Sequence, residues 1–227
     1  MAHLVSVNLA VPRHNPAKDV SVTGIDKRPT ADPVPVEAPD AQGISGLAGD
    51  RIFDVAHHGG PDQAVYAYAR EDLDEWAELL GRPLSSGSFG ENVTTSGLDV
   101  TGALIGERWR VGDVVVLEVS APRIPCNTFA HWIAEQGWVK HFTGRAVPGA
   151  YLRVVHPGEI RAGDPVVVTH RPDHDVTIGV TFRAVTREPE LLPRLLTAEA
   201  LAEDLRAAVA RRTGAGADPP PSSVPAS

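Results

Sequence analysis

The single cysteine of this chain, Cys126, stands in the stretch APRIPC (121–126). Pro122 and Pro125 bias the residues before them away from helical dihedral angles, so the stretch is expected to be extended and stiff. It follows a strand-like run and precedes an expected helix, a junction that can face a pocket. Arg123, ~10 Å away along an extended chain, and the helix N-terminus would both favour the thiolate. The alternative is an inert, buried cysteine.

Histidines and glycines form a second polar cluster, in GDRIFDVAHHGGPDQAVY (49–66). His57 and His58, with carboxylates nearby, have the ligand types of a zinc site. However, adjacent residues of an extended segment point in opposite directions, so both rarely reach one ion. The alternative is that Gly59 and Gly60 allow a sharp turn, which one histidine stabilises by a hydrogen bond.

A glycine-rich stretch, GSFGENVTTSGL (87–98), surrounds Glu91 and Asn92. Loops of this composition let backbone N–H groups approach an anion or a polar ring. No Walker Lys-Ser/Thr pair follows and the G-x-G-x-x-G spacing is absent, so neither nucleotide-binding motif is indicated. The alternative is a turn that touches no ligand.

Short strands separated by Gly, Pro and Asp account for most of the chain up to residue 170. We predict strands at 3–10, 19–25, 62–69, 114–120 and 165–170, and an edge strand or ordered loop at 28–43. Helices are predicted at 70–81, with Gly81 as the C-cap, and near 127–137. The sequence therefore predicts a mainly β protein with flanking helices.

The chain changes character after His170. We predict a linker at 171–176, a strand at 177–186, and helices at 188–196 and 197–212, the last with Thr197 as its N-cap. These helices either pack on the strand-rich part, which we expect, or form a surface for a partner or a homodimer. Residues 213–227 are small, polar and proline-rich, and are predicted to be disordered.

Composition limits the classes of function. The 227 residues suit one domain with appendages, and the net charge of -8 argues against a nucleic-acid partner. No apolar run reaches the ~18 residues of a membrane span, and the start of the chain lacks the features of a secretory signal. One cysteine forms no internal disulfide and is too few for an iron–sulfur cluster. We therefore expect a cytoplasmic protein.

Four stretches, GLAGD, HGGPDQAVYAY, GSFGENVTTSGL and IGERWRVGDVVVLEVSAPRIPC, occur in this order along the chain. In order and spacing they resemble the MOSC domain, the C-terminal domain of molybdenum cofactor sulfurases, and most of all its stand-alone YiiM-like bacterial subgroup. The resemblance implies a β-barrel with a few helices over residues 1–170. Residues 171–212 resemble the small three-helix domain that follows it in that subgroup.

The resemblance also implies a site for molybdenum cofactor (molybdopterin). Its cysteine, matched by Cys126, would bind molybdenum or carry sulfur. His58, Gly59 and Gly60 match the family's His-Gly-Gly, and Glu91 and Asn92 match its Gly-Glu-Asn. We expect four cations near the cofactor and its phosphate: Lys27, Arg28, Arg51 and Arg123. Departures from the family pattern occur at Ile52 and Phe53, where Gln-Ala is frequent, and at Thr128, where Lys or Arg is frequent.

The function implied is the reduction of N-hydroxylated bases and related small molecules. Cys126 would be the protein ligand, and Glu91 or His58 would relay protons. The chain shows no flavin or iron–sulfur motif, so a separate reductase, expected to be a flavoprotein, would supply the electrons. The alternative is a carrier that holds the cofactor or a persulfide on Cys126. A hydrolase with His58 or His131 as the base is a third hypothesis, but no Cys-His-Asn signature supports it.

Overall fold

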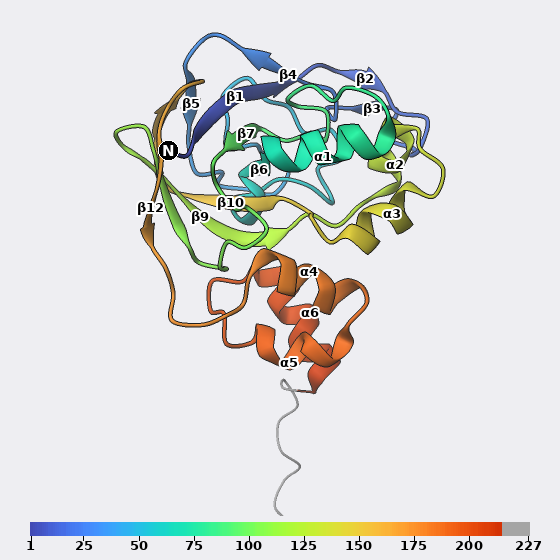
Figure 1. Ribbon diagram of the computed structural model, residues 1–227, viewed down its shortest axis with the longest axis vertical. Coiled ribbons are helices and arrows are strands. Elements are labelled where there is room, and N and C mark those ends of the chain that lie inside the picture. The colour runs from blue at the N-terminus through green and yellow to red at the C-terminus, as the bar shows by residue number, and fades with distance from the viewer. Residues whose placement is uncertain (215–227) are drawn as a thin grey trace, which may run out of the picture.

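The computed structural model describes residues 1–214 and is mainly β-sheet with surrounding helices (Figure 1). Eight strands form one sheet in which all neighbours are antiparallel except β6 and β7. The spatial order is β12 (Val166–His170), β8 (Arg108–Val111), β9 (Val115–Pro122), β10 (Ala150–His156), β6 (Val65–Ala69), β7 (Val93–Ser96), β1 (His3–Ala10) and β4 (Lys27–Thr30). Two small ladders pair β2 (Arg13–His14) with β3 (Val22–Thr23), and β5 (Val34–Val36) with β11 (Gly158–Ile160).

The expected closed barrel is not found, because the sheet runs in a single open order from β12 to β4. The start of β1 does meet the chain just before β12: the Leu4 N–H donates to the Asp164 carbonyl at 2.9 Å, and the Val166 N–H to the Ala2 carbonyl at 2.9 Å. The far half of the same edge of β1, from Val7 to Ala10, is paired with β4. Two segments thus share one strand edge, and no continuous ladder closes the sheet.

Helices lie along the sheet and after it. Those within the strand-rich part are η1 (Pro61–Gln63), α1 (Arg70–Leu80), α2 (Asn127–Ile133) and α3 (Trp138–Arg145). Those after it are α4 (Ile178–Thr186), η2 (Pro189–Leu191), α5 (Leu192–Leu195) and α6 (Glu203–Thr213), which group together at one end of the molecule in Figure 1. No helix among the residues up to 214 has the length and hydropathy needed to cross a membrane.

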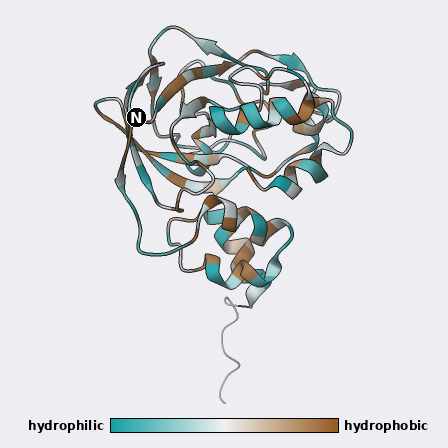
Figure 2. Ribbon diagram, viewed as in Figure 1, coloured by the Kyte–Doolittle hydropathy of each residue, from teal (hydrophilic) through white to brown (hydrophobic). Residues whose placement is uncertain are grey.

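The prediction of a helix at 70–81 is confirmed by α1, which buries Leu73 and Trp76 and turns hydrophilic residues outward (Figure 2). Its C-cap is Gly81, in the left-handed region at φ 63° as predicted. The helix expected near 127–137 is present as α2 but ends at Ile133, where Ala134 (φ 57°) breaks the helical path, and α3, which follows Gly137 (φ 72°), was not predicted.

Two predictions for the C-terminal part are wrong. Residues 177–186 form helix α4 rather than a strand, and the Thr177 hydroxyl accepts a hydrogen bond from the Val180 N–H at 3.1 Å as an N-cap. Thr197 is not an N-cap, since its hydroxyl donates to the Arg194 carbonyl and the last helix begins only at Glu203. The predicted disorder of 213–227 concerns residues that, apart from 213 and 214, lie outside those described.

Two apolar clusters fill the interior. One lies within the sheet, and the other is an aromatic cluster that includes Trp76, Phe89, Phe129, Trp138 and Phe142. Along β9 the buried and half-buried residues first alternate, and from residue 119 on every residue is buried. The strand thus passes into the interior next to the aromatic cluster and delivers the APRIPC stretch there.

Candidate functional site

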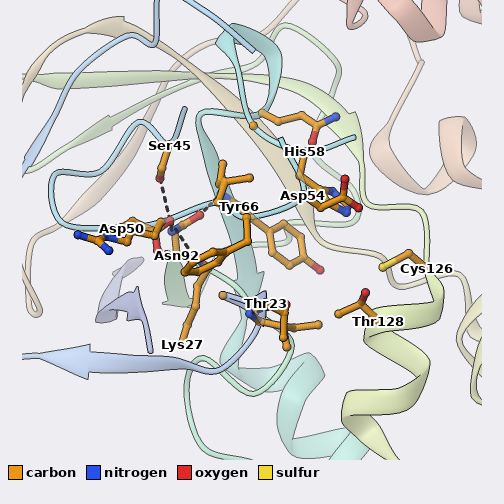
Figure 3. Close-up of a pocket in the computed structure, with 18 of the residues that line it drawn as sticks. Thr23, Lys27, Ser45, Asp50, Asp54, His58, Tyr66, Asn92, Cys126 and Thr128 are labelled. Atoms are coloured by element: carbon orange, nitrogen blue, oxygen red, sulfur yellow. Dashed lines mark hydrogen bonds and ion pairs between the residues drawn. The ribbon is translucent and has the colours of Figure 1, made fainter. Parts of the chain in front are cut away.

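A pocket lies where the β2–β3 hairpin, the loop 45–63 and the end of β9 meet. Its volume is about 740 Å³ when the solvent-filled space at its open mouth is included. Figure 3 shows side chains from these segments facing one void, with Cys126 on its wall. Segments far apart in the sequence therefore form one polar, concave site.

Cys126 is the free thiol of this pocket and the N-cap residue of α2. Burial alone would raise the pKa of Cys126. Hydrogen bonding from the His58 side chain, the charge of Arg123 and the Phe129 N–H outweigh burial and lower that pKa to about 6. The thiol is therefore mainly thiolate at neutral pH, and the inert buried cysteine is not what the structure shows.

Arg123 holds its guanidinium inside the protein, with only 7% of the residue exposed. Its Nη1 donates to the Phe89 carbonyl at 2.5 Å, and its Cζ lies 4.2 Å from the Phe129 ring centroid and 5.1 Å from that of Tyr66. Although burial acts to lower the pKa of Arg123, the neighbouring tyrosines and Cys126 raise it. The group is a fixed positive charge beside the thiol.

Asp50 organises the opposite part of the pocket (Figure 3). Its carboxylate accepts hydrogen bonds from Lys27 Nζ at 2.6 and 2.7 Å, Ser45 Oγ at 2.8 Å and Asn92 Nδ2 at 2.8 Å. Burial alone would raise the pKa of Asp50, but Lys27 and these donors hold it below its usual value. Lys27 and Asn92 thus line the pocket as expected, but their polar groups already bind Asp50.

Arg51, His58 and Gly59, three of the predicted site residues, line the pocket. Arg51 is exposed, and no ion pair joins its guanidinium to another residue within 1–214. Gly59 has φ 80°, and a Cβ there would approach Ile52 Cδ1 to 2.4 Å, so the turn requires glycine.

Three predicted site residues do not line the pocket: Gly60, Arg28 and Glu91. Arg28 is outside its lining and binds Asp26 at 3.1 Å, with 58% of its side chain exposed. Glu91 is fully buried behind the wall and accepts hydrogen bonds from the Gly87 N–H at 2.5 Å and the Phe89 N–H at 3.0 Å. We therefore do not retain Glu91 as a proton relay, because its carboxylate accepts the hydrogen bonds that close the 87–91 turn.

The zinc interpretation of the two histidines is not supported. His57 turns outward, 70% exposed, and its Nδ1 lies 2.8 Å from Asp54 Oδ1, whereas His58 faces the pocket. Within the described part of the chain no group of three or more His, Cys, Asp or Glu side chains is placed to hold a metal ion. His131 lies exposed on α2, outside the pocket lining, and is not placed to act as a base for Cys126.

Sequence reasoning missed several residues of this wall. Tyr66 and Tyr151 line the pocket beside Arg123, and Asn15 and Thr23 reach it from the β2–β3 hairpin. The tyrosines looked like ordinary strand residues, and no motif marked the hairpin. Asp50 belonged to a recognised stretch, GLAGD, but its role as hydrogen-bond centre depends on partners that are distant in sequence.

Comparison with known proteins places these residues in a family. The MOSC domain model matches residues 54–167, which include His58, Arg123 and Cys126. A Bacillus subtilis (strain 168) protein, "Uncharacterized protein YflK", is 32% identical over 193 residues, 84% of each chain. A Gibberella moniliformis protein named "Reductase" is 35% identical over 135 residues, which cover 56% of this chain and 23% of that protein.

A solved structure agrees with this result. The crystal structure of YiiM from Geobacillus stearothermophilus superposes with a TM-score of 0.75 at 28% sequence identity, covering 93% of this chain and 99% of the other. The similarity extends beyond the strand-rich part into the C-terminal helices. The chain therefore belongs to the MOSC domain family, among its YiiM-like members.

Proposed function

We propose that this chain binds molybdenum cofactor in the Cys126 pocket and reduces N-hydroxylated small molecules with electrons from a separate flavoprotein reductase. The observation that carries the proposal is the position of Cys126: a thiol with a pKa of about 6, on the wall of a polar pocket, next to a buried arginine. Membership of the MOSC family supports the choice of cofactor.

The residues present fit this cofactor. A thiolate is a soft ligand suited to a sulfur-rich metal centre, and Cys126 supplies one. The pterin carries a phosphate and many hydrogen-bonding groups, and Arg51 lines the pocket with no carboxylate partner among residues 1–214. Lys27 is neutralised by Asp50, so it would contribute hydrogen bonds more than net charge. Cys126 and Arg51 are thus the residues that would hold the group.

The reaction proposed breaks an N–O bond: R–NHOH, two electrons and two protons give R–NH₂ and water. When bound, the cofactor would supply the two-electron exchange. Tyr66, Tyr151 and Phe53 form part of the pocket wall. Their side chains would orient the substrate and exclude water from it. His58 lines the pocket and its side chain hydrogen-bonds the sulfur, so its imidazole is placed to act as the general acid that passes a proton to the substrate.

A reductive role is supported by the fungal relative. The protein named "Reductase" contains a segment 35% identical to this chain, and that segment is 23% of its length. With a single cysteine, this chain has too few thiols for an iron–sulfur cluster of its own. These facts favour electrons that arrive from another protein or another domain.

The proposal is tested by metal analysis of protein made in a host that synthesises molybdenum cofactor. We expect about one molybdenum per wild-type chain and none retained by Cys126→Ser. Two arginines provide a matched pair: Arg51→Gln should lower retention, and Arg28→Gln, outside the pocket, should not. With a chemical reductant, the loaded wild type should reduce an N-hydroxylated purine. Equal molybdenum in wild type and Cys126→Ser would refute the assigned ligand.

The carrier function is favoured by one observation, the thiolate at neutral pH, because a thiolate also accepts sulfane sulfur. The two functions give different results in the same experiment. Molybdenum retained without turnover of any N-hydroxylated compound indicates cofactor delivery. Sulfane sulfur on Cys126 without molybdenum indicates sulfur transfer.

A further inference from the structure

The pocket has two chemically different ends (Figure 3). One, the ionic end, is formed by Asp50 with Lys27, Ser45 and Asn92. The other, the thiol end, is formed by Cys126 with side chains from the β2–β3 hairpin and from α2. A substrate that reacts near the sulfur must contact the thiol end.

Two neutral polar side chains meet across the thiol end. Asn15 comes from the hairpin and Thr128 from the first turn of α2, and they are only 4% and 9% exposed. Asn15 Nδ2 donates to Thr128 Oγ1 at 3.3 Å, and Asn15 Oδ1 accepts from the Ala17 N–H at 3.1 Å. The Thr128 hydroxyl hydrogen and the second Nδ2 hydrogen find no acceptor in the described chain. The pair therefore offers two hydrogen-bond donors to a ligand.

The charged side chains that line the pocket near the thiol end already have partners. Asp54 lines the pocket, and its carboxylate binds Lys18 and His57. Arg123 is committed to the Phe89 carbonyl and faces the thiol. Arg51 directly follows Asp50, so its backbone belongs to the ionic end. The Asn15–Thr128 pair itself supplies two neutral donors and no positive charge, so burying an anion against it would cost hydration that the pair does not replace.

We propose that Asn15 and Thr128 determine substrate specificity in the Cys126 pocket by donating hydrogen bonds to an uncharged N-hydroxylated substrate, and that anionic analogues are discriminated against. This inference rests on the proposed function. An N-hydroxy oxygen or a neighbouring ring nitrogen accepts from the Thr128 hydroxyl and the Asn15 amide. An uncharged amidoxime, hydroxylamine or N-hydroxylated base has such acceptors, and its burial does not carry the desolvation cost of a charged group.

The test compares benzamidoxime with its 4-carboxylate, a pair that differs in charge. Molybdenum content is measured first, on each loaded protein. Dissociation constants then come from calorimetry without reductant, so that no turnover occurs, and kcat and KM from assays with a chemical reductant. The variants are Thr128→Val, which removes only the hydroxyl, Thr128→Ser, which keeps it, and Thr128→Lys, which adds a charge. Thr181→Val, in the buried face of α4, is the matched control.

We expect Thr128→Val to weaken benzamidoxime binding roughly 10-fold, as loss of one hydrogen bond to a buried group does, with molybdenum unchanged. Thr128→Ser should stay within roughly 3-fold of wild type, and Thr181→Val should match wild type. Wild type should bind benzamidoxime at least about 10-fold more tightly than the 4-carboxylate, and Thr128→Lys should reduce this ratio of dissociation constants.

Each result has one meaning. Loaded, active wild type that does not distinguish the two amidoximes, or Thr128→Val that binds both as wild type does, overturns the specificity assignment and leaves the proposed function intact. Wild type without molybdenum overturns the proposed function, whatever the variants do. A Thr128→Val protein that loses its molybdenum assigns Thr128 to cofactor binding and overturns the inference.

Discussion

Replacing His58 should change the ionisation of Cys126 more than any distant substitution. In the wild type, burial acts to raise the pKa of Cys126, but hydrogen bonding from His58 and the charge of Arg123 bring it to about 6. At pH 7 a thiol with that pKa is about 90% thiolate, against about 3% for an ordinary cysteine with a pKa of about 8.5. His58→Leu removes the hydrogen bond, the largest of the effects that lower the pKa, and leaves the burial that raises it, so the pKa of Cys126 should rise.

The assay is the rate of alkylation by iodoacetamide across pH 5 to 10 on protein purified without cofactor. Because the chain has one cysteine, the rate reports a single group. We expect a midpoint near pH 6 for wild type and a higher midpoint for His58→Leu. The adjacent His57, which is 70% exposed and turned away from the pocket, gives the control: His57→Leu should titrate as wild type does.

The same interaction predicts how stability depends on pH. The folded pKa of Cys126 lies below the unfolded value, so its contribution is fully present above pH ~8.5 and is lost as pH falls toward 6. Over this window wild type should lose more unfolding free energy than Cys126→Ser in urea titrations. A wild-type alkylation midpoint near 8.5, or identical midpoints for wild type and His58→Leu, would refute the reasoning.

Three other substitutions test the scaffold of the pocket by urea unfolding. Asp50→Asn leaves buried Lys27 without its counter-ion and should lower the free energy of unfolding by about 3–5 kcal/mol. Because the pKa of Asp50 is lowered in the folded protein, the difference in stability between wild type and this variant should shrink as pH falls below about 4. Gly87→Ala should cost at least about 1–2 kcal/mol, since Gly87 has φ 87° and a Cβ would lie 2.1 Å from the Lys27 carbonyl oxygen; unchanged stability would contradict that geometry. Thr177→Ala should cost about 1 kcal/mol through loss of the cap on the Val180 N–H, and an unaltered midpoint would show that the cap is not needed.

The sequence predicted best what depends on local patterns. Alternating residues indicated the strand at 3–10, whose bounds match β1, and the apolar spacing with Gly81 indicated α1. The proline-braced cysteine was correctly placed between a strand and a helix. These features are determined by residues within a few positions of one another.

The sequence could not predict which of two locally allowed structures the surroundings of a segment select. Glu91 looked like a titratable group in a ligand loop, but its carboxylate turns inward to nearby N–H groups. The β-branched residues of 177–186 suggested a strand, yet the segment is a helix buried on several sides. Ile178 and Ala184 pack in the sheet cluster, Phe182 packs in the aromatic cluster, and Thr177 caps the helix. In both cases packing decided between two structures that the local sequence allowed.

The C-terminal helices show why this matters for the site. The Glu203 N–H donates to Asp62 Oδ2 at 2.7 Å, across 141 positions of sequence, and the Ala202 N–H donates to the Ser120 carbonyl at 3.0 Å. Asp62 is adjacent to a pocket-lining residue, and Ser120 lies on the strand that leads to Cys126. The Ser120 hydroxyl in turn donates to the Asp62 carbonyl at 2.6 Å, which ties the two walls together.

The start of α6 therefore contacts the segments that lead into both pocket walls, one at Asp62 and the other at Ser120. A rigid pocket requires that the loop carrying His58 and the strand end carrying Cys126 keep a fixed separation, because the hydrogen bond between them lowers the pKa of the thiol. Arg153 adds to the same junction by binding Asp62 at 2.5 Å and the Ala200 carbonyl at 2.7 Å. A helical segment that contributes no residue to the pocket lining thus supports the geometry on which the chemistry of the thiol depends.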